Sequence, residues 1–343
     1  MLRFGVKLHE SPNGSIAMKH PALRGRYAPS PTGDLHLGNV RTALLAWLFA
    51  RKAGGAFVLR IEDLDRPRVR PGATARMLED LRWLGLDWDE GPECGGLYGP
   101  YLQSERQAIY DAALARLRAA DLVYPCYCSR AEVARAASAP QGAGDEGPRY
   151  PGTCRNLTPA ERRAREAAGR RPCLRFRAPD RLIEFVDLVA GPVVQNVAQA
   201  VGDFIVSRSD GIPAYQLAVV VDDGLMGITQ VIRGADLLSS TARQIALFEA
   251  LGFATPEFGH VPLVVDAAGA RLAKRDHAAG VGALRVAGLS PEQVLGALAA
   301  SCGLCPPGEA LSARELLARF ESERLIGVAA GPVIIHHADP DPL

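Results

Sequence analysis

The stretch RYAPSPTGDLHLGN, residues 26–39, decides the fold of this chain. It predicts a buried strand, a turn rich in proline and glycine, and a helix whose first turn carries His36, Gly38 and Asn39. A helix start leaves backbone N–H groups unpaired and carries the positive end of the helix dipole, so phosphate oxygens bind there. We interpret this corner as a nucleotide-binding site, although the same residue types also build ordinary turns between a strand and a helix.

The helix after the turn is predicted to separate a functional face from a buried face. His36 and Asn39 lie three residues apart and therefore share one face. Gly38 leaves room for a base or a ribose against that face. The opposite stripe is apolar and expected in the core: Val40, Leu44 and Leu48.

Patterns along the chain predict an α/β fold with a doubly wound parallel sheet. An apolar run at residues 56–61 follows the first helix, and a strand, a helix and a strand in this order form a right-handed βαβ unit. Further strands are expected at residues 204–206, 215–220 and 228–233, with a hairpin turn at 209–211. We divide the chain into an extension (1–23), a first half of the sheet domain (24–124), an insertion (125–180), a second half of the sheet domain (181–252) and a largely helical remainder (253–343).

Composition and charge limit the class of protein. The chain has 343 residues, 48% of them hydrophobic, and a net charge of +1, so it can form a full core but has no overall basic field. Any nucleic-acid partner therefore needs a local patch. Residues 1–23 hold no apolar run of signal-peptide length, and no later segment has the length of a membrane span. We expect a cytoplasmic protein without a membrane partner.

Acidic residues follow the second predicted strand at its carboxyl end. Residues 62–65 read Glu-Asp-Leu-Asp directly after the apolar run. Ligands of open parallel sheets bind at the carboxyl ends of the strands, so these acids are expected to face the binding crevice. We select Glu62 as a carboxylate that binds an ammonium group. Helix capping or a solvated surface is the alternative.

A basic loop, residues 271–275, follows a predicted strand at 261–265. The chain has 39 basic residues, and only four of them are lysines, one of which is Lys274. A lysine ammonium is a compact point charge on a flexible stem, as a phosphate clamp requires. Charged segments of this kind are more usually solvated loops, so this one is informative only beside the other motifs.

Three cysteines in the insertion have the spacing of metal ligands. Seven cysteines are an odd number in a chain without an export signal, which favours metal binding or free thiols over disulfides. Cys126, Cys128 and Cys154 supply three thiolates, whereas zinc takes four ligands. No histidine lies between residues 37 and 259, so the fourth ligand is an oxygen or Cys173. The alternative is a small core of buried cysteines.

Together these motifs resemble the class I aminoacyl-tRNA synthetases of the glutamyl type, over about residues 24–276. Residues 29–33 with 36–39 resemble the HIGH signature of that class, and residues 271–275 resemble its KMSKS loop. Arg26, with residues 61–65, resembles the glutamate branch. The chain departs from the pattern at two positions, because Asn39 stands at the second histidine of HIGH and Ala273 replaces the serine of the loop.

The resemblance implies activation of L-glutamate by ATP, with Mg²⁺. In such a site His36 and Lys274 are catalytic and neutralise charge on the transferred phosphate, and the same two residues bind ATP together with Gly38 and Asn39. An arginine pairs with a carboxylate through two hydrogen bonds and so distinguishes glutamate from glutamine by charge. The implied glutamate pocket consists of these residues: Arg26, Tyr27, Ala28, Pro29, Ser30, Glu62, Tyr215 and Arg233.

Within the glutamyl type, the chain resembles a shortened branch that joins glutamate to the queuosine base at the wobble position of tRNA(Asp). That branch has a Cys-x-Cys and Tyr-x3-Cys zinc site, which implies that Tyr150 is the fourth ligand of a structural Zn²⁺. Only 68 residues follow Arg275, so we expect no anticodon-binding domain in residues 253–343, and a monomer. The alternatives are a synthetase that charges the 3′ end of tRNA(Glu), a non-catalytic tRNA-binding module, and a small-molecule nucleotidyltransferase.

Overall fold

A four-stranded parallel sheet forms the centre of the molecule. The computed structural model describes residues 22–136, 148–265, 280–326 and 333–334. The strand order is β2-β1-β8-β9, and every neighbouring pair is parallel. The helix α1 (Leu37–Lys52) connects the two strands of the first βαβ unit, as the sequence predicts. The strands are β1 (Arg24–Tyr27), β2 (Ala56–Leu59), β8 (Gln230–Gly234) and β9 (Glu257–Val261).

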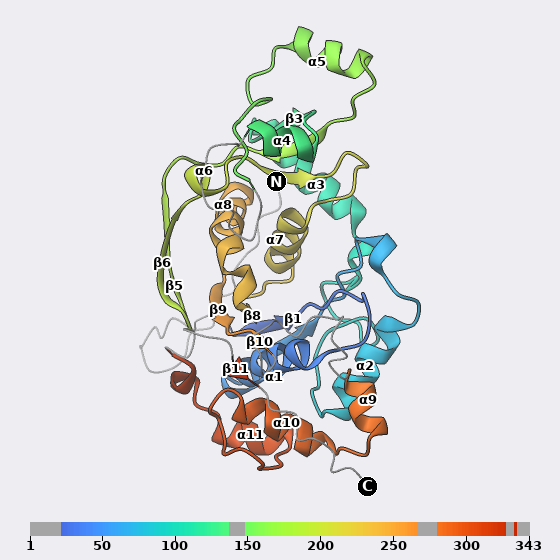
Figure 1. Ribbon diagram of the computed structural model, residues 1–343, viewed down its shortest axis with the longest axis vertical. Coiled ribbons are helices and arrows are strands. Elements are labelled where there is room, and N and C mark those ends of the chain that lie inside the picture. Colours follow the sequence, from blue (N-terminus) through green and yellow to red (C-terminus); the bar gives the residue numbers. More distant parts are fainter. Residues whose placement is uncertain (1–21, 137–147, 266–279, 327–332, 335–343) are drawn as a thin grey trace, which may run out of the picture.

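The two faces of this sheet bury two separate cores, which makes the fold doubly wound. Side chains alternate across a strand, so Phe57 and Leu59 enter one core while Val58 enters the other. Figure 1 shows α1, α10 and α11 on one side of the sheet and α7 and α8 on the other. Besides α1, these helices are α7 (Tyr215–Leu225), α8 (Thr241–Leu251), α10 (Pro291–Ala300) and α11 (Ala313–Arg319).

The apolar stripe of α1 is where the sequence places it. Val40, Leu44 and Leu48 are 0% exposed and belong to the core that α10 and α11 complete. The helix is buried on most of its circumference, because the sheet covers one side and the two C-terminal helices cover another. Burying a leucine side chain contributes roughly 1.5–3 kcal/mol, so this packing fixes the helix start against the sheet.

The strand predicted at residues 215–220 is wrong, because these residues form the first part of α7. Local sequence favours a strand here, since Val219, Val220 and Val221 are β-branched and the run is continuously apolar. A helix that is buried on nearly all sides has the same appearance, and α7 packs against α3 (Gln107–Ala119) and α8. Of the predicted hairpin, one bridge between Ser207 and Pro213 is present.

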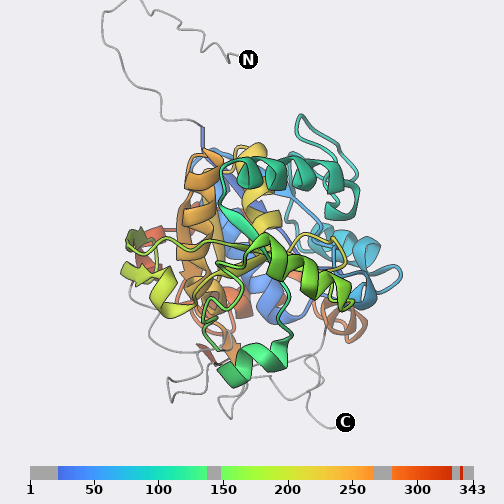
Figure 2. The ribbon, with the colours of Figure 1, turned by 90° about the horizontal axis from the view of Figure 1, so that it is seen from above.

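The described residues between 123 and 207, from β3 to β7, build an upper lobe above the parallel sheet (Figure 1). The other helices and strands not yet named lie in the lower part of the molecule. An antiparallel sheet, order β3-β4-β7, and a hairpin of β5 and β6 join the insertion to the parallel sheet, and α4 and α5 lie toward the end of the molecule away from α10 and α11 (Figure 1). Figure 2 shows this end from above. These elements are β3 (Val123–Cys126), α4 (Arg130–Ala136), α5 (Pro159–Ala167), β4 (Cys173–Phe176), β5 (Leu182–Asp187), β6 (Gly191–Asn196), α6 (Val197–Ala200), β7 (Phe204–Ser207), α2 (Ala73–Trp83), β10 (Val264–Val265), α9 (Val281–Val286) and β11 (Val333–Ile334).

The described ranges bear on two further expectations. None of their helices combines the length and the apolar character needed to cross a membrane. The domain limits drawn from the sequence stay predictions, although the change from the α/β pattern near residue 125 does coincide with β3 and the start of the upper lobe.

Two glycines on neighbouring helices give a matched test of the C-terminal packing. A Cβ added at Gly296 of α10 would lie 1.8 Å from the carbonyl oxygen of Glu309, whereas a Cβ at Gly282 of α9 would have nothing within 4 Å. We expect Gly296→Ala to lower the free energy of unfolding by about 1–3 kcal/mol. Gly282→Ala should leave it unchanged or raise it by up to about 1 kcal/mol. Urea unfolding of both variants measures the difference, and equal stabilities would contradict the described packing.

Candidate active site

The carboxyl ends of β1, β2 and β8 bring the predicted site residues to one edge of the sheet. The amide N–H of Arg60 donates to the carbonyl oxygen of Tyr27 over 3.0 Å, and the N–H of Glu62 donates to that of Pro29 over 2.9 Å. These bonds hold the end of β2 against the proline-rich turn. Glu62 therefore lies beside the backbone of Pro29 and Ser30, as expected for acids that follow a parallel strand.

A buried cluster of opposite charges lies at this edge. The Arg60 guanidinium is 2.7 Å from Asp223 and 3.1 Å from Glu62, and Arg26 is 3.5 Å from Asp223. Burial raises the pKa of Glu62, against the pull of Arg60 and Arg26. For Asp223 burial acts in the same direction, but Arg60 and Arg26 outweigh it and lower the pKa of Asp223. Buried charges of this kind persist only when they are paired.

A second layer of polar side chains holds this cluster, from α7, from α3 and from the segment just before α3. Asp222 of α7 is wholly buried and lies 2.7 Å from the Nε of Arg106. It also accepts hydrogen bonds from Gln103 over 2.8 Å and from Tyr110 over 2.9 Å, and the Nε of Arg60 is 3.5 Å away. Sequence reasoning missed Arg60, Asp222 and Asp223. The available signal was that Asp222 and Asp223 directly follow the apolar run at residues 217–221. Predicting a strand at residues 215–220 obscured that signal.

Arg233, from β8, is buried and has only neutral hydrogen-bond partners among the described residues. Its Nε donates to Nε2 of His260 over 2.9 Å, its Nη1 to Gln244 over 2.7 Å, and its Nη2 to Thr241 over 2.9 Å. Burial lowers the pKa of this guanidinium. Arg26, Glu62, Tyr215 and Asp223 all lie close enough to Arg233 to interact with it electrostatically, so the structure brings the four predicted residues together and adds Asp223. A buried cation whose hydrogen bonds, among the described residues, all go to neutral groups is suited to an anionic ligand.

The two tyrosines of the predicted pocket differ in exposure. Tyr215 begins α7 and is 39% exposed, so its side chain is accessible at the edge of the cluster. Tyr27 ends β1 and is buried, and its hydroxyl has no hydrogen-bond partner among the described residues. Burial raises the pKa of Tyr27 above its ordinary value, so the hydroxyl stays protonated. Ala28 follows directly and leads into the turn.

The helix start after the turn has the form that the sequence predicts. His36 is the N-cap of α1, and its Nδ1 accepts from the N–H of Asn39 over 3.4 Å. A Cβ at Gly38 would lie 3.1 Å from the His36 ring, so the glycine already makes room for this imidazole. Lys274 and the rest of the basic loop lie in residues 266–279, outside the described residues.

The three cysteines of the upper lobe form one cluster of sulfur atoms. The Sγ atoms of Cys126, Cys128 and Cys154 all lie within 4.8 Å of one another. The hydroxyl of Tyr150 is 3.3 Å from the Sγ of Cys126 and accepts from the N–H of Cys154 over 2.8 Å. Cys173 instead points its thiol to the carbonyl oxygen of Cys126 over 3.4 Å. Three sulfurs therefore gather with the phenol oxygen of Tyr150 beside one of them, and these are donor types that zinc takes.

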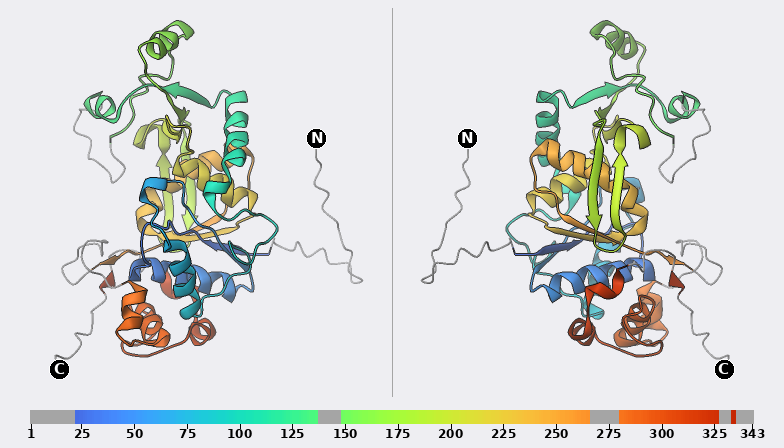
Figure 3. Two further views of the ribbon diagram at one scale, coloured as in Figure 1. Left: turned by 90° about the vertical axis from the view of Figure 1, so that its right-hand side faces the viewer. Right: turned by 90° about the vertical axis from the view of Figure 1, so that its left-hand side faces the viewer.

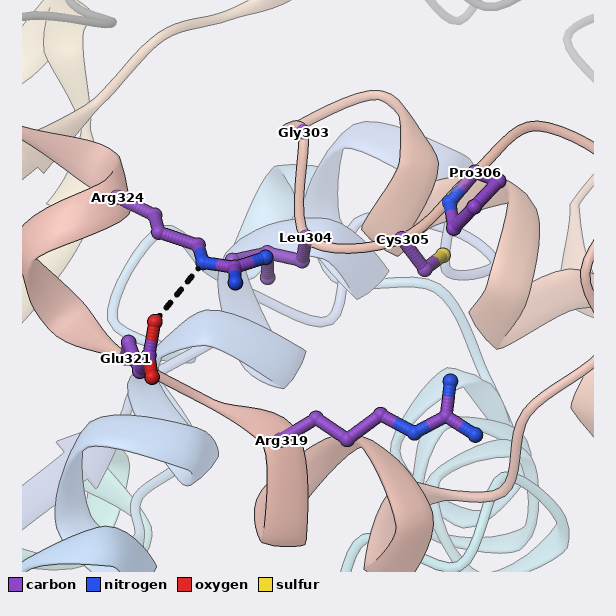
Figure 4. Close-up of a pocket in the computed structure, with 7 residues that line it drawn as sticks. All are labelled: Gly303, Leu304, Cys305, Pro306, Arg319, Glu321 and Arg324. Carbon is purple, nitrogen blue, oxygen red and sulfur yellow. Dashed lines mark hydrogen bonds and ion pairs between the residues drawn. The ribbon is translucent and has the colours of Figure 1, made fainter.

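The hollows on the surface of the described residues include a smaller one and a larger one. The smaller one, of about 290 Å³, is lined by Asp63, Arg66, Val69, Pro71 and Ser104, and Asp63 directly follows Glu62 in the sequence. The other, of about 580 Å³, lies in the C-terminal helical part and is drawn in Figure 4. Its arginines are already paired, Arg319 with Glu309 over 2.6 Å and Arg324 with Glu321 over 3.0 Å. We assign no ligand to this second hollow.

A helix start at the carboxyl edge of a parallel sheet, with a buried ion cluster beside it, is typical of nucleotide-binding proteins of the doubly wound α/β class. The family model described as the catalytic domain of class I tRNA synthetases (E and Q) matches residues 22–326. Glutamyl-Q tRNA(Asp) synthetase of Symbiobacterium thermophilum is 59% identical over 303 residues, which cover 88% of this chain and 94% of that protein.

Two other proteins are similar to a lesser degree. Glutamate--tRNA ligase of the same organism is 45% identical and matches 88% of this chain but 64% of its own length. A crystal structure of a glutamate tRNA ligase from Elizabethkingia meningosepticum, in complex with its amino acid, has a TM-score of 0.79 and 33% identity, over 92% of this chain and 67% of that chain. The chain therefore belongs to the class I tRNA synthetases of the E and Q type, among the glutamyl-Q tRNA(Asp) synthetases. It is a ligase that uses ATP.

Proposed function

We propose that this chain activates L-glutamate with ATP and Mg²⁺ to glutamyl-adenylate, and transfers the glutamyl group to the queuosine base of tRNA(Asp). The observation that carries the proposal is Arg233, a buried cation with neutral partners at the edge where the nucleotide corner lies. The acceptor rests on likeness to relatives. In one organism the glutamyl-Q tRNA(Asp) synthetase is 59% identical to this chain and the glutamate--tRNA ligase is 45% identical. We propose that the enzyme acts as a monomer.

In the proposed complex, the glutamate pocket divides its contacts among three charged residues. Glu62 accepts from the α-ammonium group, because its carboxylate lies at the end of β2 beside the turn. Among the described residues Arg26 donates one hydrogen bond, from Nη1 to the carbonyl oxygen of Ile232 over 3.3 Å. It therefore keeps N–H groups for a carboxylate fork. Arg233 adds a positive charge and one further N–H.

Activation is a phosphoryl-type substitution in which positioning and charge neutralisation matter most. A carboxylate oxygen of glutamate attacks the α-phosphorus of ATP, the bond from that phosphorus to the bridging oxygen breaks, and pyrophosphate leaves with its electron pair. No proton moves in this step. In the proposal His36 and Lys274 stabilise the negative charge on the phosphate oxygens, and the backbone N–H groups at the start of α1 assist them.

The cysteine cluster is proposed to hold a structural zinc ion. The ligands would be Cys126, Cys128, Cys154 and Tyr150, since these four donor atoms gather while Cys173 is engaged with a carbonyl oxygen. The guanidinium of Arg175 lies 3.7 Å from the centre of the Tyr150 ring, and its Nε is 3.3 Å from the Sγ of Cys126. A cation at this place offsets the negative charge of three thiolates and a phenolate. A structural zinc contributes directly to folding.

A pair of variants distinguishes the two candidates for the fourth zinc ligand. The purified protein should contain one zinc ion per chain. We expect Tyr150→Phe to weaken zinc binding by more than the roughly 10–100-fold that loss of an outer-shell partner costs. Cys173→Ser should bind zinc as the wild type does. Competition with a chromophoric chelator measures both, and the reverse order would assign the site to Cys173.

Glutamate-dependent exchange of pyrophosphate with ATP tests the activation step. We expect exchange in the absence of any tRNA. Glutamine and aspartate should replace glutamate poorly, because the pocket reads both the charge and the length of the side chain. If no amino acid supports exchange with the zinc-loaded protein, the chain does not activate an amino acid unaided, and this part of the proposal fails.

A further inference from the structure

A buried aspartate joins the β5–β6 hairpin to the sheet directly behind Arg233. Asp187 ends β5 and is buried. Its Oδ1 accepts from the backbone N–H groups of Val189 over 3.0 Å, Ala190 over 2.9 Å and His260 over 3.0 Å. Its Oδ2 lies 2.5 Å from Nδ1 of His260. Figure 3 shows the hairpin running down to the level of the parallel sheet. The hydrogen bond from the N–H of His260 joins Asp187 to β9.

These contacts determine where His260 carries its proton. Because the Asp187 carboxylate is an acceptor, Nδ1 of His260 must be the N–H donor. The other ring nitrogen, Nε2, faces the Nε–H of Arg233 over 2.9 Å and must therefore be a lone-pair acceptor. In a protonated imidazole, the N–H on Nε2 would face the Nε–H of Arg233, and two donors cannot bond to each other. Burial also lowers the pKa of His260, which agrees with a neutral ring.

Counting donors shows what this arrangement leaves for a ligand. A guanidinium has five N–H groups. In Arg233 one is bonded to His260 and one to Gln244, and Nη2 donates to Thr241 over 2.9 Å and to the carbonyl oxygen of Leu237 over 3.3 Å. Among the described residues, one N–H of Arg233 has no partner, and it lies on Nη1. The plane of the guanidinium is thus fixed on three sides, and the direction of the remaining N–H is fixed with it.

We propose that Asp187 and His260 are positioning residues for substrate binding: Asp187 sets the tautomer of His260, and His260 orients Arg233 so that its last N–H meets a carboxylate of glutamate. This inference rests on the proposed function, because it needs glutamate as the ligand of Arg233. Neither residue touches the substrate. Their effect is on the affinity for glutamate and not on the chemistry at the phosphate.

Two substitutions of His260 separate its two hydrogen bonds. In His260→Gln the side-chain oxygen reaches the position of Nε2 and can still accept from Arg233. In His260→Asn the amide N–H takes the position of Nδ1 and can still donate to Asp187, but nothing accepts from Arg233. We expect His260→Asn to raise the KM for glutamate roughly 10–100-fold, as for the loss of a hydrogen bond to a charged group, and His260→Gln to raise it less than about threefold. The KM for ATP and the kcat should change little in both.

Thermal unfolding of the same variants distinguishes positioning from mere packing. His260→Asn keeps the buried bond to Asp187 and should be the more stable of the two, so the order of stability is opposite to the order of glutamate affinity. If the KM for glutamate instead rises most in the less stable variant, His260 is only structural and the inference is wrong.

Asp187→Asn adds a readout that does not depend on activity. An amide in place of the carboxylate donates to Nδ1 and forces the proton of His260 onto Nε2, against Arg233. NMR of the histidine ring nitrogens should show the Nδ1–H tautomer in the wild type and the Nε2–H tautomer in this variant, with the KM for glutamate raised as in His260→Asn. A wild-type Nε2–H tautomer would overturn the inference whatever the activity. Absence of exchange in the wild type would instead count against the proposed function.

Discussion

Replacing Arg233 with methionine is expected to weaken glutamate binding about 100-fold or more and to lower the free energy of unfolding by about 1–3 kcal/mol. The loss of affinity follows from breaking a buried charge pair, which costs about 3–5 kcal/mol when one partner stays behind, here the carboxylate of the ligand. The loss of stability follows because the buried acceptors on His260 and Gln244 are left without a donor, although none of the described hydrogen-bond partners of Arg233 is a carboxylate. Steady-state exchange gives the KM for glutamate, and urea unfolding gives the stability.

Arg106 supplies the matched control, because it is also a buried arginine but has a carboxylate partner at 2.7 Å. We expect Arg106→Met to lower the free energy of unfolding by about 2 kcal/mol, since Asp222 then loses a charged hydrogen bond. Arg233→Met would not be a glutamate-site variant if it raised the KM for ATP and left that for glutamate unchanged. That outcome would assign the residue to the phosphates.

Removing the imidazole of His36 or the ammonium of Lys274 is expected to reduce exchange by roughly 100–1000-fold, the cost of losing one group that stabilises a developing charge. His36→Ser is the informative substitution. Serine is a good N-cap, so it preserves the start of α1 while it removes the ring. Lys274→Ala is the companion variant for the basic loop. Circular dichroism and unfolding should be unchanged in both.

Exchange that survives either change within about threefold, a difference of less than roughly 1 kcal/mol in the barrier, would show that the residue is not catalytic. His36→Asn serves as a further comparison. It also caps the helix, and it offers an N–H donor in place of the imidazole. Activity restored in part by asparagine and not by serine would indicate that a hydrogen bond, and not charge, is what His36 supplies.

The sequence predicts the part of the site that depends on local rules. The turn at residues 29–33 and the apolar stripe of Val40, Leu44 and Leu48 follow from helix-start chemistry and helical spacing, and the structure has both. Glu62 follows from the rule that ligands bind at the carboxyl ends of parallel strands. The cysteine spacing predicts a cluster, and three sulfurs do meet.

The sequence does not predict the parts that depend on burial from many directions. The valine run in α7 favours a strand locally, and only packing on several sides explains a helix there. Asp223 is recognisable as a partner of Arg60 only when α7 lies against the end of β2. His260 and Asp187 are 73 residues apart, so no spacing rule connects them. The role of Lys274 stays a prediction, since it lies outside the described residues.

The central claim is the identity of the acceptor, and the most direct test is to follow labelled glutamate onto RNA. The zinc-loaded enzyme is given ATP, labelled glutamate and one of three RNAs: tRNA(Asp) that carries queuosine, tRNA(Asp) that lacks it, and tRNA(Glu). Nuclease digestion then locates the label. We expect label on the queuosine nucleoside of the first RNA and none on the other two. Label at the 3′ end of tRNA(Glu), with none on queuosine, would contradict the account and identify a charging glutamyl-tRNA synthetase.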